Sequence, residues 1–181
     1  MNRNLDNCLH LSGVIRQLRP SDLPKFRDHL LRLDATSRRE RFNGLVHDRF
    51  ISAYAYRSFA AGTTIIAYLE GDEVLGAAEI HERAGTQEPT AEIAFSVEPH
   101  LQHRGLGRLL FAQLIEKARD FGYTKLLIST TPQNAPMRAL ARRYNAHLAF
   151  QDGETLGNID LDPLMPLSVS ASAGKPERAV L

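Results

Sequence analysis

A chain of 181 residues, 43% of them hydrophobic, is long enough for one compact domain with a buried core, which argues against a wholly disordered protein. Lys and Arg number 22 against 21 Asp and Glu, a net charge of +1, so the composition offers no general attraction for nucleic acid. The single cysteine, Cys8, excludes an intramolecular disulfide and a zinc site built from cysteine pairs.

The two ends of the chain differ in composition from its middle. Residues 1–10 (MNRNLDNCLH) are polar and lack the basic-then-apolar order of a signal peptide, and no run reaches the roughly 18 apolar residues of a membrane span. Residues 166–181 are small, polar and without periodicity, as in a disordered tail. We therefore expect a flank over residues 1–12, one folded domain over residues 13–165, a cytoplasmic location and no membrane partner.

The first third of the sequence predicts one strand followed by helices. Residues 13–19 alternate apolar and polar side chains, which is typical of a strand, and Asp22 then provides a helix N-cap. Apolar side chains at helical spacing form the buried stripe of the next helix: Leu23, Phe26, Leu30 and Leu33. A second helical region spans residues 37–58, with an interruption near Asn43. Its arginines offer two interpretations, contact with a phosphate or a solvated helix face, and the second is the leading expectation: Arg38, Arg39 and Arg41.

The remaining two thirds predict strands interleaved with helices. Two strand-like runs, residues 63–70 and 73–83, flank a Gly-Asp hairpin signal, and a third run covers residues 91–99. Then follow a helix over residues 105–121, a strand over residues 125–130, a helix over residues 135–144, and strands over residues 147–151 and 155–161. This order predicts an α/β domain built around one mixed sheet.

The turn before the helix at residue 105 carries the most informative pattern, VEPHLQHRGLGR over residues 97–108. A helix N-terminus has unpaired N–H groups and a partial positive charge, and Gly105 and Gly107 let a phosphate approach the backbone. Neither a GxxxxGK[ST] loop nor a GxGxxG loop is present. Taken alone, the pattern leaves two alternatives open: an anion site, or a tight turn that uses glycine for clearance.

The segment QHRGLG over residues 102–107 resembles the Q/R-x-x-G-x-G/A signature of the GNAT N-acetyltransferase superfamily. The likeness extends over residues 14–161, because the V-x-P strand, the following helix, the strand KLLIST and Asn134 occur in that family's order. The runs AEIAFSVEPHLQHRGLGRLL and SRRERFNG are similar to the acetyltransferase domains of bacterial protein lysine acetyltransferases. The resemblance implies the GNAT fold, a single mixed, mainly antiparallel sheet flanked by helices.

The resemblance also implies acetyl-CoA as co-substrate, with no metal. The implied pyrophosphate site is the signature loop, acting mainly through main-chain N–H groups: Gln102, His103, Arg104, Gly105, Leu106, Gly107 and Arg108. The implied path of the pantetheine arm runs along the central strand near Phe95 and Val97. Asn134 matches an asparagine that contacts this arm in the family.

Acetyl transfer to an amine needs a proton acceptor, because a lysine amine has a pKa of about 10.4. Along the strand, Glu92, Ala94 and Ser96 share one face and Ile93, Phe95 and Val97 the other. A symmetric hairpin sets His81 opposite Glu92 and Glu79 opposite Ala94. Glu92 is the candidate base, since it lies on the more polar face and matches the general-base glutamate of the lysine acetyltransferases. The alternative is a solvent-facing strand glutamate, and Glu79 and His81 are second candidates.

The general acid is less well defined. Many family members carry a tyrosine in the helix after the asparagine, in the pattern N-x-x-x-x-x-L-Y; here Leu140 fits the leucine, but Ala141 stands in place of the tyrosine. Tyr144 lies about one turn further along the helix and is the candidate acid. Packing at the helix end, and a reaction without a general acid, are the alternatives.

The resemblance, together with these residues, implies an N-acetyltransferase that moves the acetyl group directly to a primary amine in a ternary complex. The leading acceptor is a protein lysine, with a small-molecule amine as the alternative. A non-catalytic acyl-CoA-binding regulatory module would keep the signature loop without needing Glu92. Nucleic acid is not expected as a partner, and both monomeric and oligomeric states remain open.

Overall fold

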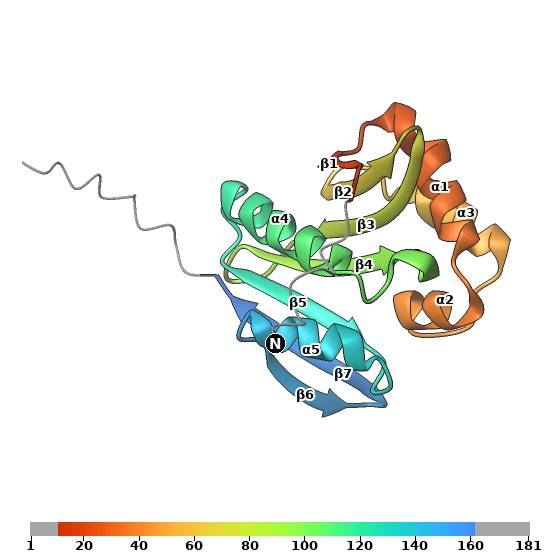
Figure 1. The fold of residues 1–181 in the computed structure, drawn as a ribbon. Helices are drawn as coiled ribbons and strands as arrows, with labels where there is room; N and C mark the ends of the chain where they lie inside the picture. The colour runs from red at the N-terminus through yellow and green to blue at the C-terminus, as the bar shows by residue number, and fades with distance from the viewer. Residues whose placement is uncertain (1–10, 162–181) are drawn as a thin grey trace, which may run out of the picture.

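Seven strands form one sheet in the order β1-β2-β3-β4-β5-β7-β6, with helices on both faces (Figure 1). This computed structural model describes residues 11–161, so the expected tail and most of the expected flank lie outside the described residues. The elements are β1 (Val14–Gln17), η1 (Pro20–Asp22), α1 (Leu23–Arg32), α2 (Ala35–Phe42), α3 (Asp48–Arg57), β2 (Thr63–Glu70), β3 (Glu73–Glu82), β4 (Thr90–Val97), η2 (Pro99–Leu101), α4 (Leu106–Asp120), β5 (Lys125–Thr130), α5 (Ala135–Arg143), β6 (His147–Gln151) and β7 (Glu154–Asp160). The predicted fold class is confirmed.

All neighbouring strands pair antiparallel except β4 and β5, which are parallel. The β3–β4 hairpin has the symmetric register expected from the sequence, with His81 opposite Glu92 and Glu79 opposite Ala94. Because side chains alternate along a strand, Glu79, His81 and Glu92 share one face of the sheet.

Each face of the sheet has its own apolar core. Helices α1 and α3 cover β2 and β3 on one face through Phe26, Leu30, Ile51 and Ala55, all without exposed surface. Helix α4 covers the other face through a cluster of buried side chains: Leu106, Leu110, Phe111, Leu114, Ile115 and Ala118. The sheet is thus held between two apolar cores.

The caps of α2 explain its boundaries. The Asp34 carboxylate accepts a hydrogen bond of 2.7 Å from Ser37 N, so the helix begins at Ala35, two residues before the predicted start. Asn43 ends the helix with a φ of 51°, in the left-handed region, where the predicted interruption lies. Helix α2 is therefore a short separate element whose last turn faces β4.

Candidate active site

The sheet opens between β4 and β5. Their parallel pairing begins at Thr90↔Lys125 and ends at Glu92↔Leu127, so residues 93–97 of β4 have no partner strand on this side. The other edge of β4 stays paired with β3 as far as Val97. One backbone edge of β4 is therefore available to a ligand that enters the gap.

The loop between β4 and α4 presents a row of unpaired amides. Gly105 is the N-cap of α4 with a φ of 88°, and His103 has a φ of 57°. Within residues 11–161, no backbone N–H from His103 to Gly107 donates to a protein acceptor, whereas those of Arg108 and Leu109 bond to Gly105 O at 3.1 Å. These amides lie at the positive end of a 15-residue helix, an arrangement that binds phosphate-like anions.

A cleft of about 170 Å³ connects this loop with the open edge of β4; we call it the β4–α5 cleft. Six of the residues expected to contact acetyl-CoA line it together: Phe95, Val97, Gln102, His103, Gly107 and Asn134. Its other lining residues are Glu40, Ser96, Pro136, Met137 and Leu140. Residues separated by up to 100 positions in the sequence, from Glu40 to Leu140, thus line the same cleft.

The remaining loop residues surround the cleft without lining it. Arg104, Gly105 and Arg108 are exposed, whereas Leu106 is fully buried in the core. The Leu106 side chain lies so close to β3 that a Cβ on Gly76 would be 3.1 Å from it. Leu106 can therefore offer a ligand only its backbone amide.

A second pocket, of about 570 Å³, lies where α2 meets β4, and we call it the α2–β4 pocket. Glu92 lines it with a side chain that is 40% exposed, and the Arg83 guanidinium is 3.3 Å from the carboxylate. Ser129 and Glu154 form the opposite wall, where the Ser129 hydroxyl donates to Glu154 and accepts from Asn43 Nδ2 at 2.7 Å. The pocket therefore holds two carboxylates at the mouth of the gap in the sheet.

Behind this pocket lies a buried network around Glu79. The carboxylate has 1% of its surface exposed and accepts hydrogen bonds from Arg41 and from Tyr54 Oη, the latter at 2.8 Å. Burial acts to raise the pKa of Glu79, but Arg41 and His81 hold it below its ordinary value. Arg41 is 7% exposed, so the expected solvated position is wrong for this residue.

The hydrogen bonds of this network fix the positions of Glu79 and His81, the two second candidates for the base. Glu79 is enclosed by its partners and does not line the α2–β4 pocket. His81 lines the pocket, but its Nε2 is 3.2 Å from Tyr54 Oη and its Nδ1 is 3.2 Å from Thr63 Oγ1. Of the three candidates, Glu92 has the carboxylate that faces the open space.

Replacing Arg41 with methionine is expected to lower the free energy of unfolding by about 3–5 kcal/mol, because it leaves the Glu79 carboxylate buried without its cation. Urea unfolding measures the change. The double variant Arg41→Met/Glu79→Met is the control, since removing both charges is expected to restore most of the loss. A single variant as stable as the wild type would show that the pair is not buried as described.

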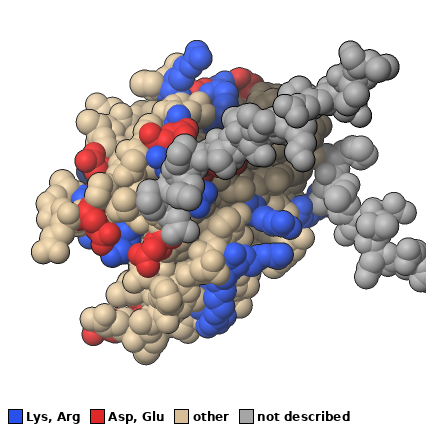
Figure 2. All heavy atoms as spheres, turned by 90° about the vertical axis from the view of Figure 1, so that its left-hand side faces the viewer, with Lys and Arg blue, Asp and Glu red and all other residues tan. Residues whose placement is uncertain are grey.

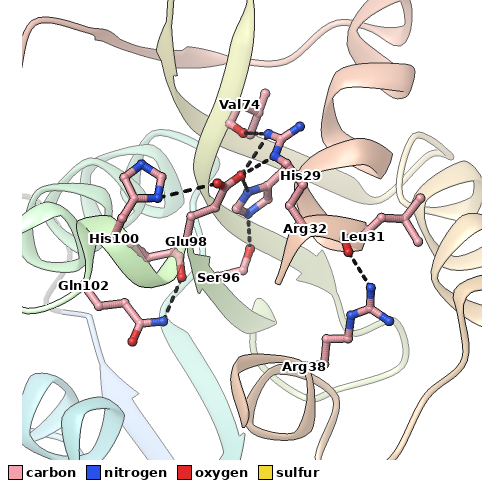
Figure 3. A network of polar contacts seen from close by, with 10 residues as sticks. His29, Leu31, Arg32, Arg38, Val74, Ser96, Glu98, His100 and Gln102 are labelled. Carbon is pink, nitrogen blue, oxygen red and sulfur yellow. Dashed lines mark hydrogen bonds and ion pairs between the residues drawn. The ribbon is translucent and has the colours of Figure 1, made fainter. Parts of the chain in front are cut away.

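A second buried network joins α1 to the end of β4 (Figure 3). His29, with no exposed surface, lies between Ser96 Oγ, 2.9 Å from its Nε2, and Glu98 Oε1, 3.2 Å from its Nδ1. Arg32 Nε donates to the same Glu98 oxygen at 2.8 Å. Gln102 Nε2 bonds to Val97 O at 2.9 Å, so the loop and the strand end are tied together.

We expect the free energy of unfolding to decrease as the pH falls below about 6.5, because burial lowers the pKa of His29 despite the opposing effect of Glu98. Below this pH, His29 binds a proton in the unfolded chain but stays neutral in the folded chain. The free energy of unfolding then falls by at most about 1.4 kcal/mol for each pH unit. Urea titrations between pH 5 and 8 measure it. His29→Gln, which does not titrate, is expected to flatten the slope; an unchanged slope would contradict the assignment.

Tyr144, the candidate acid, lies at the C-cap of α5. Its ring stacks on Phe111 with centroids 4.3 Å apart, and Phe111 stacks on Phe95 at 4.9 Å. Tyr144 lines neither the β4–α5 cleft nor the α2–β4 pocket. The contact described for this side chain is therefore packing, and its role as an acid stays a prediction.

Sequence reasoning missed the buried polar residues that support the site: His29, Arg41, Tyr54 and Glu98. One signal was present for His29, which lies three residues after Phe26 and directly before Leu30, on the apolar face of α1. A polar side chain on such a face indicates a buried partner. Its partners, Ser96 and Glu98, lie 67 and 69 residues further along the chain and had no comparable signal.

The described surface carries both signs of charge. Figure 2 shows acidic and basic side chains on the same face, without one sign covering it. In residues 11–161, no helix is long and apolar enough to cross a membrane. No group of three or more His, Cys, Asp or Glu side chains in the same part of the chain is arranged to hold a metal ion.

Comparison with known proteins places these features in context. The model of the acetyltransferase (GNAT) family matches residues 28–146. The GNAT domain of PAT from S. lividans has a TM-score of 0.73 at 19% identity, covering 82% of this chain and 90% of that chain. The Salmonella typhimurium protein yncA, solved with its cofactor acetyl-CoA, has a TM-score of 0.60 at 21% identity, covering 83% and 94%. An N-acetyltransferase from Thermoplasma acidophilum in complex with coenzyme A has a TM-score of 0.60 at 13% identity, covering 82% and 98%.

Proposed function

Since the chain belongs to the acetyltransferase (GNAT) family and so uses acetyl-CoA as its acyl donor, we propose that it acetylates a protein lysine by direct attack of the amine in a ternary complex. The observation that carries the proposal is the open edge of β4. This edge joins the loop amides in the β4–α5 cleft to Glu92 in the α2–β4 pocket, so donor and acceptor meet at the same strand.

In this proposal the β4–α5 cleft holds the donor. The amides from His103 to Gly107 bind the pyrophosphate, and the exposed Arg104 and Arg108 add positive charge beside it. The backbone near Phe95 and Val97 pairs with the pantetheine arm along the free edge of β4, through the groups left open beside Val97 O, which Gln102 already occupies. Acetyl-CoA supplies an activated thioester, and the loop amides and the edge of β4 hold it in position.

Glu92 is proposed to take the proton that the acceptor amine must lose. Its carboxylate faces the α2–β4 pocket, and the Arg83 side chain beside it is 55% exposed, so an incoming ammonium group can take the place of the guanidinium. The neutral amine then attacks the thioester carbonyl carbon, a C–N bond forms and the C–S bond breaks, and the proton that the nitrogen loses in becoming an amide balances the charge of the leaving thiolate. Tyr144 stays the candidate donor of a proton to the leaving thiolate. Because it lines neither pocket, it would have to act from outside them.

The acceptor pocket favours a cationic amine on a larger molecule. The pocket is lined by Glu92 and Glu154 and also by Arg83, which pairs with Glu92, and Arg41, which pairs with Glu79. Glu154, and Glu92 once Arg83 is displaced, can attract an ammonium group. The pocket is wide and open to solvent, which suits a side chain that extends from a protein surface. A small-molecule amine is the second candidate, because the pocket also offers aromatic walls at Phe42 and Tyr54 that can enclose one.

Calorimetric titration with acetyl-CoA, followed by release of the CoA thiol with lysine peptides and with small amines, tests the proposal. Binding with turnover on the lysine peptides is the expected result. Turnover on small amines alone would show that the acceptor is a small-molecule amine and not a protein lysine. Binding without turnover on either group would favour a regulatory acyl-CoA-binding module. Absence of binding would overturn the assignment of the donor site.

A further inference from the structure

Most polar side chains that line the β4–α5 cleft are already bonded within the protein. Ser96 Oγ is 2.9 Å from His29 Nε2, and Asn134 Oδ1 accepts from Met137 N at 3.0 Å. Gln102 Nε2 donates to Ser37 Oγ and to Val97 O, each at 2.9 Å. His103 lies at the exposed rim. Among the described residues that line the cleft, this leaves Glu40 as a half-buried carboxylate without a hydrogen bond or an ion pair.

Glu40 lies on the donor side of the site. It projects from α2 into the β4–α5 cleft, and it also lines an adjoining pocket of about 420 Å³ together with Thr131 and Gln133 from the β5–α5 loop. It is not among the residues that line the α2–β4 pocket, where Glu92 lies. A ligand that runs along the β4–α5 cleft from the loop amides toward the open edge of β4 therefore passes Glu40.

A hydrogen-bond donor would stabilise the Glu40 carboxylate in these surroundings. Burial, with a smaller contribution from Asp34, raises the pKa of the Glu40 carboxyl above its ordinary value. A half-buried carboxylate without a partner gains from any N–H that comes within reach, and such charge-assisted bonds are among the stronger ones in proteins. The pantetheine arm of coenzyme A carries two amide N–H groups.

We propose that Glu40 binds acyl-CoA by accepting a hydrogen bond from an amide N–H of the pantetheine arm, and so positions the thioester beside β4. This inference rests on the proposed function, because it needs acyl-CoA in the β4–α5 cleft. It assigns to α2 a direct contact with the donor, in addition to the contact that its last turn makes with the acceptor pocket through Arg41 and Asn43.

Two substitutions separate the hydrogen bond from the charge. Glu40→Ala removes the acceptor oxygens while keeping a strong helix former in α2, and is expected to weaken acetyl-CoA binding about 10-fold. Glu40→Gln keeps one acceptor oxygen and is expected to stay within about 3-fold of the wild type. In steady-state assays Glu40→Ala is expected to raise the KM for acetyl-CoA more than it lowers kcat.

Calorimetry with a truncated ligand provides the decisive comparison. Adenosine 3′,5′-bisphosphate lacks the pantetheine arm, so the wild type and Glu40→Ala are expected to bind it equally. Glu116→Ala, the same substitution on an exposed turn of α4, is the control for general effects.

The results that would contradict the contact between Glu40 and the pantetheine arm can be distinguished from one another. Equal affinity of Glu40→Ala and the wild type for acetyl-CoA would overturn the contact. An equal loss for the truncated ligand would also overturn it, by locating the effect away from the arm. The proposed function fails separately, when the wild type itself binds no acetyl-CoA.

Discussion

Replacing Glu92 with glutamine is expected to lower kcat by about 10²–10⁴-fold, the usual contribution of a general base. Glutamine keeps the size of the side chain but cannot accept the amine proton at neutral pH. Because the Glu92 side chain faces the α2–β4 pocket and does not line the β4–α5 cleft, affinity for acetyl-CoA is expected to stay unchanged. CoA-thiol release and calorimetry on the same preparation measure both quantities.

Two further carboxylates provide the controls for this variant. Glu73→Gln, on an exposed residue at the start of β3, is expected to leave kcat unchanged. Glu154→Gln tests the other carboxylate of the α2–β4 pocket and is expected to raise the KM for a cationic acceptor more than it lowers kcat. A wild-type kcat for Glu92→Gln together with a large loss for Glu154→Gln would move the base to β7.

Replacing Gly105 with glutamate is expected to weaken acetyl-CoA binding by at least about 100-fold. The new carboxylate stands at the N-cap of α4, where it bonds to the amides that the pyrophosphate needs and repels the phosphate charge. A Cβ at this position meets no atom within 4 Å, so the side chain fits without a clash in the folded protein. Calorimetry with acetyl-CoA gives the affinity.

Strain and charge can be separated with two companion variants. Gly105→Ala brings only the strain of a side chain at a φ of 88°, about 1–2 kcal/mol of stability, and is expected to keep most of the affinity. Gly122→Glu adds the same charge at a glycine with a φ of 79°, beyond the other end of α4, and is expected to bind acetyl-CoA normally. If Gly105→Glu retained wild-type affinity, the pyrophosphate would have to lie elsewhere.

Local patterns predicted the fold because each element carries its own signal. The strands β2, β5 and β6 occupy the predicted residues, since alternating or continuous apolar runs are bounded by glycine, proline or polar turns. The hairpin register followed from loop symmetry alone. The signature loop could likewise be located, because Gly105 lies where a strand gives way to an amphipathic helix.

Long-range polar contacts could not be predicted in the same way. The sequence around Arg41 is that of a polar helix and predicts a solvated arginine. In the structure Arg41 donates to Glu79, which lies on β3, 38 positions further along the chain. Nothing in the local sequence distinguishes it from Arg39, which is exposed. Glu40 likewise carries no local signal, since it lines the β4–α5 cleft only because α2 lies beside β4.

The strand order has a consequence for synthesis of the protein. β7 is the last strand within residues 11–161, and it pairs with β5 from Lys125↔Asp160 to Thr130↔Thr155. At about 5–20 residues per second, β5 leaves the ribosome about 2–6 s before the strand that will cover its edge. During that interval the nascent chain exposes an unpaired edge that invites association with other chains. The edge of β5, the strand that bears Ser129, is therefore open to association with other chains until β7 has been made.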